Sequence, residues 1–292
     1  MKKFLWKILL AAICVFAGQC VFWLIIIQQN IRIEDIAEEV YDAIDIAETH
    51  NTYTRVIIGD SVCRQLLAPD NQIENEEVCY LGTNQLITVC GNYILLSRYI
   101  ENNPQTEKVY YFVRPQSLGV DIDQHLFYPY FVIPFCRTEY MPYLEEETKT
   151  LLTEKFGRIF VYNRYVKGLL QNNKALLSKY IAKYHENEIK TNNLSKMTVI
   201  YLEKLQELCE EHNIEFVVIA TPLAGESSDY DWESYMSEAE AYGLEGLLSG
   251  YTDSIYYIPE EYFTDGIHLV NGYVNENREE ILKKIFGEFP IR

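Results

Sequence analysis

Short runs of β-branched and aromatic residues alternate along this chain with segments in which apolar residues recur every three or four positions. The runs predict buried strands at 56–58, 77–81, 108–113, 215–220 and 255–258. The longer segments predict helices at 31–50, 86–101, 194–212, 232–248 and 273–286. Strands and helices that alternate at this spacing indicate an α/β fold with a parallel sheet and helical crossovers.

The stretch from 116 to 193 breaks this alternation. It opens with an aromatic segment, His125-Leu126-Phe127-Tyr128-Pro129-Tyr130-Phe131, and continues with helical patterns at 144–156 and 162–184. A connection of this length is expected to have a function or a structure of its own. We therefore predict a helical insertion that lies over or beside the functional site, with His125 as a candidate for lining a substrate groove.

The N-terminal region predicts a membrane anchor. Residues 8–27 carry no charge, a length that spans a bilayer, and Lys2, Lys3 and Lys7 precede them. The positive-inside rule then gives a cytoplasmic tail at 1–7, a transmembrane helix at 8–27 and an extracytoplasmic domain at 53–292. A cleaved signal peptide is the alternative, but the apolar stretch is long for one and no small-x-small cleavage site follows it. The juxtamembrane helix at 28–52 is either a spacer or the first packing helix of the domain.

Composition narrows the classes of function. The formal charge of −18 argues against nucleic-acid binding, which needs a basic face, and against peripheral docking on anionic lipid. The five cysteines outside the membrane helix form no C-x-x-C pair and have no histidine at metal spacing, so a metal site is not expected. Most of them should be buried as small apolar residues, and one disulfide is left open. No segment is suited to binding a nucleotide or another cofactor.

Candidate chemistry begins at Gly59-Asp60-Ser61, where the first strand turns into a helix. Ser61 would stand at the carboxyl edge of the sheet, the edge at which open α/β sheets bind ligands. The alternative is that Ser61 only caps the helix, and Asp60 is interpreted as a structural hydrogen-bonding residue under the turn.

Asp265 and His268 lie far along the chain, three residues apart. That spacing puts the carboxylate and the imidazole on one side of a turn, where Asp265 can orient His268 and His268 can activate the Ser61 hydroxyl. The backbone N–H groups of Ser61 and Gly82 are candidate donors to an oxyanion.

These residues resemble the SGNH/GDSL hydrolase superfamily. Gly-Asp-Ser near the start, Asp265-x-x-His268 near the end and Leu81-Gly82-Thr83-Asn84 between them match that family's blocks over roughly 53–290, the insertion excepted. With the N-terminal anchor, the chain is similar to membrane-tethered SGNH-like proteins that work with MBOAT acyltransferases, such as the D-alanyl transfer protein of teichoic acids and the alginate O-acetylation proteins. The resemblance implies a flavodoxin-like, three-layer SGNH domain.

One block departs from the family. Its members usually carry an asparagine in a Gly-x-Asn-Asp turn after the third strand, whereas this chain has Val113-Arg114-Pro115-Gln116. Asn84 or Gln116 is a candidate replacement for that oxyanion donor.

The resemblance implies acyl transfer through an acyl-Ser61 intermediate, without a cofactor. The acceptor would be a hydroxyl of a cell-surface polysaccharide or envelope polymer, and the acyl group would come from a multi-pass partner of the MBOAT type. Two alternatives remain. One is an esterase or deacetylase of the same fold, favoured by an open site; the other is a non-catalytic member of a membrane complex, favoured by the missing asparagine.

Overall fold

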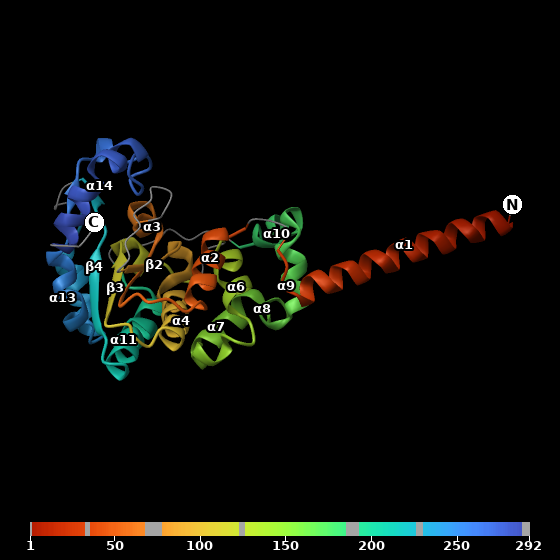
Figure 1. Ribbon diagram of the computed structural model, residues 1–292, viewed down its shortest axis with the longest axis horizontal. Helices are drawn as coiled ribbons and strands as arrows, with labels where there is room; N and C mark the ends of the chain where they lie inside the picture. The colour runs from red at the N-terminus through yellow and green to blue at the C-terminus, as the bar shows by residue number, and fades with distance from the viewer. Residues whose placement is uncertain are drawn as a thin grey trace.

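The computed structural model describes residues 2–32, 36–67, 78–122, 126–184, 193–225 and 230–287 (Figure 1). Its strands are β1 (Arg55–Gly59), β2 (Val78–Gly82), β3 (Lys108–Val113), β4 (Glu215–Ala220), β5 (Leu223–Ala224) and β6 (Tyr257–Ile258). Up to the insertion its helices are α1 (Lys2–Gln28), α2 (Glu38–Ala47), α3 (Ser61–Leu67), α4 (Thr88–Asn102) and α5 (Pro115–Leu118). The insertion contains α6 (Ile133–Phe135), α7 (Glu146–Phe156), α8 (Arg158–Tyr162), α9 (Arg164–Gln171) and α10 (Lys174–Ile181). The remaining helices are α11 (Lys196–Glu211), α12 (Trp232–Ala241), α13 (Glu245–Asp253) and α14 (Asn271–Phe286).

A four-stranded parallel sheet forms the centre of the domain, in the order β2-β1-β3-β4. Gly59 pairs in register with Gly82 on one side and with Phe112 on the other, so the carboxyl ends of these three strands meet at one edge. The predicted mixed α/β class with a parallel sheet is therefore confirmed. Two of the predicted strands, 108–113 and 215–220, have the predicted bounds.

Apolar side chains leave the sheet on both faces. Val56 and Ile58 belong to the larger hydrophobic cluster, together with α2, α4 and α11, whereas Ile57 belongs to a smaller cluster with α3 and α14. This alternation is the period of two expected of a strand buried on both sides. Helices accordingly pack against both faces of the sheet (Figure 1).

Helix α1 is long and apolar enough to cross a membrane. It projects from the rest of the molecule, and only its last turn is buried, at Ile26 and Ile27 (Figure 1). Helix α2 packs against α4 and β2, and five of its residues lie in the larger cluster. The interpretation of 28–52 as the first packing helix therefore describes α2 better than the spacer does.

The aromatic segment of the insertion is part of the core. Phe127, Tyr128 and Phe131 are fully buried, and the Phe127 and Phe131 rings stack with their centroids 4.6 Å apart. These side chains therefore fill the interior and do not line a groove. His125, the candidate groove residue, lies outside the described residues.

Three local predictions differ in detail from the structure. The single helix predicted at 232–248 is broken, because Gly243 adopts a φ of 73° and the Leu244 N–H donates to the Ala239 carbonyl, which ends α12 before α13 begins. The short strand predicted at 255–258 is present as β6, which pairs with β5 in a separate two-stranded sheet. The pattern predicted at 162–184 is likewise divided, by Asn163 and Asn173, whose side chains cap α9 and α10.

Candidate active site

The serine turn, which we define as residues 59–63, is built into the interior of the domain. A Cβ atom at Gly59 would lie 2.1 Å from the Phe112 carbonyl oxygen, so only glycine allows β1 and β3 to approach this closely. The buried Asp60 carboxylate accepts hydrogen bonds through Oδ1 from the backbone N–H groups of Val62 (3.0 Å) and Cys63 (3.3 Å). Asp60 therefore caps α3, and the interpretation of Ser61 as only a cap is wrong.

The second oxygen of Asp60 ties this turn to the end of β3. Oδ2 accepts from the Arg114 backbone N–H at 2.9 Å and from the Ser117 hydroxyl at 2.6 Å. Because all four hydrogen bonds are buried, the carboxylate fixes the position of the turn from two sides. Asp60 thus has the structural role predicted for it.

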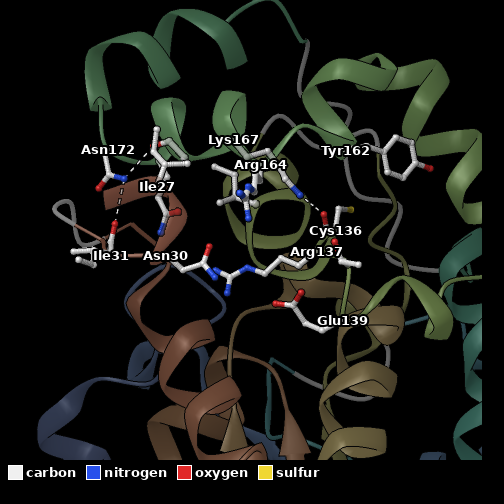
Figure 2. A pocket seen from close by; sticks show the side chains of 14 residues that line it. Ile27, Asn30, Ile31, Cys136, Arg137, Glu139, Tyr162, Arg164, Lys167 and Asn172 are labelled. Carbon is white, nitrogen blue, oxygen red and sulfur yellow. Dashed lines mark hydrogen bonds between the residues drawn. The ribbon is translucent and has the colours of Figure 1, made fainter. Parts of the chain in front are cut away.

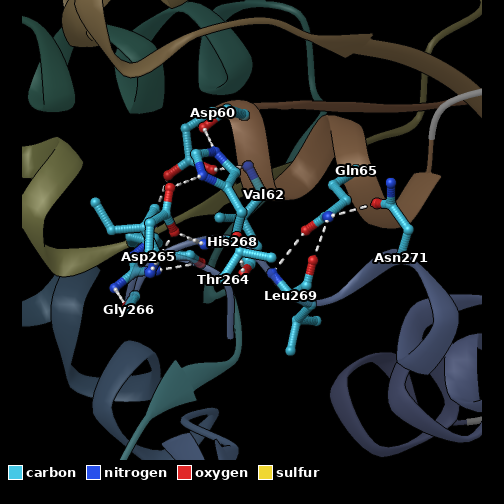
Figure 3. Close-up of polar contacts among 12 residues, drawn as sticks. Asp60, Val62, Gln65, Thr264, Asp265, Gly266, His268, Leu269 and Asn271 are labelled. Carbon is cyan, nitrogen blue, oxygen red and sulfur yellow. Dashed lines mark hydrogen bonds and ion pairs between the residues drawn. The ribbon is translucent and has the colours of Figure 1, made fainter. Parts of the chain in front are cut away.

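The histidine turn, residues 264–269, lies beside Asp60 and Val62 of the serine turn (Figure 3). It brings Asp265 and His268 to Ser61. Asp265 Oδ1 accepts from the backbone N–H groups of Ile267 and His268, so the carboxylate shapes its own turn. Its Oδ2 lies 2.9 Å from His268 Nδ1, and His268 Nε2 lies 2.8 Å from Ser61 Oγ. The three predicted side chains therefore form one continuous series of hydrogen bonds, in the order carboxylate, imidazole, hydroxyl.

The electrostatics of Asp265 favour a charged carboxylate. Desolvation raises the pKa of Asp265, but the hydrogen bonds from the His268 backbone, the His268 ring and the Ile267 backbone outweigh it and lower the pKa to about 2. Both side chains remain accessible, with 52% of the Asp265 side chain and 37% of the His268 side chain exposed. A carboxylate that stays ionised can accept from the ring and stabilise an imidazolium.

Two residues that the sequence did not single out for this role hold the histidine turn in place. Arg114 donates from its guanidinium to the carbonyl oxygens of Ile267 (2.5 Å) and Gly266 (3.3 Å). Gln65 donates to the Leu269 carbonyl at 2.7 Å and accepts from the Leu269 N–H at 3.0 Å. Arg114 stands where the resembled family has its asparagine loop, and this departure was the only signal that the position is special.

The four candidate oxyanion donors differ in whether the structure leaves them free to donate at the site. The Ser61 backbone lies in the first turn of α3. Gly82 is the last residue of β2, and a Cβ atom there would lie 3.1 Å from the Arg64 backbone. Asn84 lines the same pocket as Ser61, and its Oδ1 accepts from the Leu86 N–H, which leaves the amide group for other partners. Gln116 does not fit, because its amide donates to the Tyr230 hydroxyl and accepts from Arg114.

A polar pocket opens over Ser61. Its lining comes from α2, α3, the segment after β2 and the C-terminal region: Glu39, Ser61, Arg64, Gln65, Thr83, Asn84, His268, Asn271, Val274, Asn275 and Arg278. None of these lining residues belongs to 116–193, so, of the two predicted placements over or beside the site, the described part of the insertion does not lie over it.

The remaining groups with chemical potential lie elsewhere. The His50 ring contacts the Asn102 carbonyl, and His212 ends α11. All five cysteines outside α1 are buried, as predicted, and none of the seven in the chain is disulfide-bonded. Within the described ranges no group of three histidine, cysteine or acidic residues is placed to hold a metal ion.

Comparison with known proteins gives little further information. No family model matches the chain, and no curated protein matches it. A solved structure with the provisional description of a platelet activating factor from Streptococcus pneumonia is similar over 92% of this chain and 97% of its own, with 12% identity and a TM-score of 0.38. A likeness of that size carries no argument about fold or activity.

Proposed function

We propose that this protein is a membrane-anchored serine enzyme of the SGNH type that acts on acyl esters through an acyl-Ser61 intermediate. The observation that carries the proposal is the hydrogen-bonded series Asp265–His268–Ser61, assembled from residues more than 200 positions apart. The series contains a carboxylate, an imidazole and a hydroxyl in the order that activation of a serine nucleophile requires. Three such side chains rarely come together by chance. The sheet order β2-β1-β3-β4, with Ser61 at the carboxyl edge, supports the flavodoxin-like SGNH domain.

The proposed chemistry uses the chain's own side chains. His268 Nε2 takes the proton of the Ser61 hydroxyl as Oγ attacks the ester carbonyl, and the N–H groups of Ser61 and Gly82 with the Asn84 amide stabilise the oxyanion. His268 then gives its proton to the leaving alkoxide, which departs and leaves the acyl-serine. A second hydroxyl, from water or an alcohol, repeats the two steps in reverse and frees the serine.

The open pocket favours water as the acceptor, and therefore an esterase or deacetylase. His268 is more than one-third exposed, and the described part of the insertion contributes nothing to the pocket lining. Water reaches an acyl-enzyme in such a site unless a bound substrate excludes it.

Transfer to a hydroxyl of a cell-surface polysaccharide is the second candidate. It is supported by α1, because an anchor would hold the domain beside a multi-pass acyl donor of the MBOAT type and raise the effective concentration of both. In this reading the N-terminus is cytoplasmic and the domain extracytoplasmic, following Lys2, Lys3 and Lys7.

A serine-directed fluorophosphonate probe tests the proposal on the full chain in detergent micelles. We expect labelling of the wild type, no labelling of Ser61→Ala, and labelling at least about 100-fold slower in His268→Ala. Asp253→Ala, an exposed residue at the end of α13 that does not line the pocket over Ser61, is the matched control and should label like the wild type. A folded wild type that takes up no probe would refute an activated serine and favour the non-catalytic partner.

Hydrolysis and transfer are separated by the fate of the acyl group. A small acetyl ester should release acetate in proportion to the alcohol leaving group if water is the acceptor. Formation of a new acetyl ester on an added oligosaccharide, at the expense of acetate, would instead support transfer.

A further inference from the structure

Although the whole chain is negatively charged, residues 155–184 form a strongly basic segment. Residues 155–184 contain seven lysines and arginines and no aspartate or glutamate, in a chain with 25 basic and 43 acidic residues. The seven are Lys155, Arg158, Arg164, Lys167, Lys174, Lys179 and Lys183. They fall on or beside helices α8, α9 and α10, so the positive charge is gathered on one part of the fold.

The same three helices carry exposed apolar side chains. Outside α1, the described residues include nine large hydrophobic side chains that are exposed, and five of them lie on α8–α10. They are Ile159, Tyr162, Tyr165, Leu169 and Leu176. Aliphatic and tyrosine side chains beside lysines and arginines are typical of helices that lie in a membrane interface.

The fold places these helices at the end of α1. Gly168 of α9 packs directly on Ile27, and a Cβ at Gly168 would lie 2.8 Å from that side chain. Figure 1 shows α9 and α10 at the base of α1, with α13 and α14 at the opposite end of the domain. If α1 spans a bilayer, α8–α10 are therefore the part of the domain nearest to its surface.

A pocket between α1 and α9 is lined by several cationic side chains (Figure 2). Arg137, Arg164 and Lys167 line it, with Glu139 as the one acidic residue of the lining. The Lys167 side chain is nearly buried, and its ammonium donates to the Cys136 carbonyl.

The amide nitrogen of Gln171 is buried against the same pocket and has no hydrogen-bond partner among the described residues. A buried donor without a partner is unusual and is relieved by a bound acceptor. Burial lowers the pKa of Lys167 to about 8. An acceptor with negative charge would also stabilise the protonated form of this side chain.

We propose that α8–α10 lie on the membrane surface and that the pocket lined by Arg137, Arg164 and Lys167 takes the phosphate of an anionic phospholipid headgroup. The lining has three cations and one carboxylate, and the Gln171 amide is a further donor. This set of charges and donors suits the oxygens of a phosphate group. The net charge of the whole chain argued against such docking. The attraction to an anionic bilayer, however, depends on the charged residues that lie close to its surface. This inference rests on α1 as a membrane anchor and not on the chemistry at Ser61.

The surface contact is tested with a fluorescent label on the full chain reconstituted into vesicles. The label is attached to Leu169→Cys (α9) in one protein and to Tyr242→Cys (end of α12) in another. Both are made in a background with Cys14→Ala and Cys20→Ala, in which the other thiols are buried. Both positions are exposed, so Tyr242 is a matched control at the far end of the domain. Retention of the protein on vesicles after an alkaline wash establishes separately that α1 is inserted.

Lipids with a nitroxide on the headgroup should quench the label at Leu169 at least about threefold more than at Tyr242 when the vesicles contain phosphatidylglycerol. The triple variant Lys174→Gln, Lys179→Gln, Lys183→Gln should weaken the docking equilibrium roughly 100-fold, because each lysine near an anionic surface contributes about a factor of five. Equal quenching at Leu169 and Tyr242 in inserted protein would overturn the proposal and favour α8–α10 as a face for a protein partner.

The pocket is tested by native mass spectrometry of the full chain in detergent with phosphatidylglycerol or phosphatidylcholine. We expect retained phosphatidylglycerol in the wild type, at least about tenfold less in Arg164→Gln and in Gln171→Leu, and no change in Lys283→Gln on α14. Equal retention of the two lipids, or full retention by both pocket variants, would refute the headgroup site.

Discussion

The serine turn and the histidine turn meet at one hydrogen bond but are held in opposite ways. The serine turn is buried, and its position is set by a glycine that admits no side chain and by a carboxylate with four hydrogen bonds. The histidine turn lies at the surface and is held from outside, by Arg114 on one side and Gln65 on the other. The nucleophile therefore stands on a turn whose other residues are buried, whereas the base is carried by a surface segment that needs separate support.

The difference predicts that variants of the serine turn affect folding, and that variants around the histidine turn affect chemistry more than folding. Buried polar networks cost stability when one partner is removed, because the remaining donors lose their partners. Carbonyl oxygens of a surface turn can be hydrated when a donor is removed, so hydrogen bonds to them contribute less to stability but still set the position of a reacting group.

The largest effect is expected for Asp60→Ala. It leaves the N–H groups of Val62, Cys63 and Arg114 without their acceptor in the interior, so the free energy of unfolding should fall by roughly 3 kcal/mol or more. Urea denaturation of the full chain in detergent measures this. Asp45→Ala on the exposed face of α2 is the control and should change stability by less than about 0.5 kcal/mol. Similar stabilities of the two variants would contradict the comparison.

Arg114→Met should lower the rate of probe labelling roughly 100-fold, because it frees the carbonyls of Gly266 and Ile267 and lets the imidazole move from Ser61. The Arg114 backbone bond to Asp60 is kept, so the urea midpoint should move much less than in Asp60→Ala. Gln116→Ala removes a contact of Arg114 without touching the histidine turn and should label within about threefold of the wild type. A rate unchanged in Arg114→Met would show that the turn keeps its own position.

Gln65→Ala should have a smaller effect, about a tenfold slower labelling rate, because Arg114 still holds the other end of the turn. Gln65→Glu keeps the acceptor for the Leu269 N–H but loses the donor to the Leu269 carbonyl, so its rate should lie between those of Gln65→Ala and the wild type. The same rate for all three proteins would assign the support to Arg114 alone.

The smallest effect concerns pH. Because the pKa of Asp265 is lowered to about 2, the unfolded chain binds a proton between pH ~3.9 and 2 that the folded chain does not. This contribution to stability is complete above that interval and is lost as the pH falls through it. Urea midpoints of the wild type and Asp265→Asn should therefore differ at pH 6 and converge as the pH is lowered towards 2. A constant difference would indicate that Asp265 titrates normally.

Local patterns predicted much of what the structure describes. The strands at 108–113 and 215–220 have the predicted bounds, because a run of apolar residues between turns leaves few alternatives to a buried strand. Gly-Asp-Ser was identified as a candidate from its place between a strand and a helix, and Asp265-x-x-His268 from its three-residue spacing. Where a single residue decided the outcome, as Gly243 did by dividing 232–248 into α12 and α13, periodicity was not enough.

By itself the sequence determined the apolar helix at the N-terminus, the alternating α/β order and the residue types at the candidate site, because each of these is carried by neighbouring residues. Only the tertiary structure decided that Arg114 holds the histidine turn, that the aromatic segment is core, and that the basic segment 155–184 packs beside the end of α1. Those facts depend on contacts between residues far apart in the chain. Net charge and periodicity average over such contacts and cannot locate them.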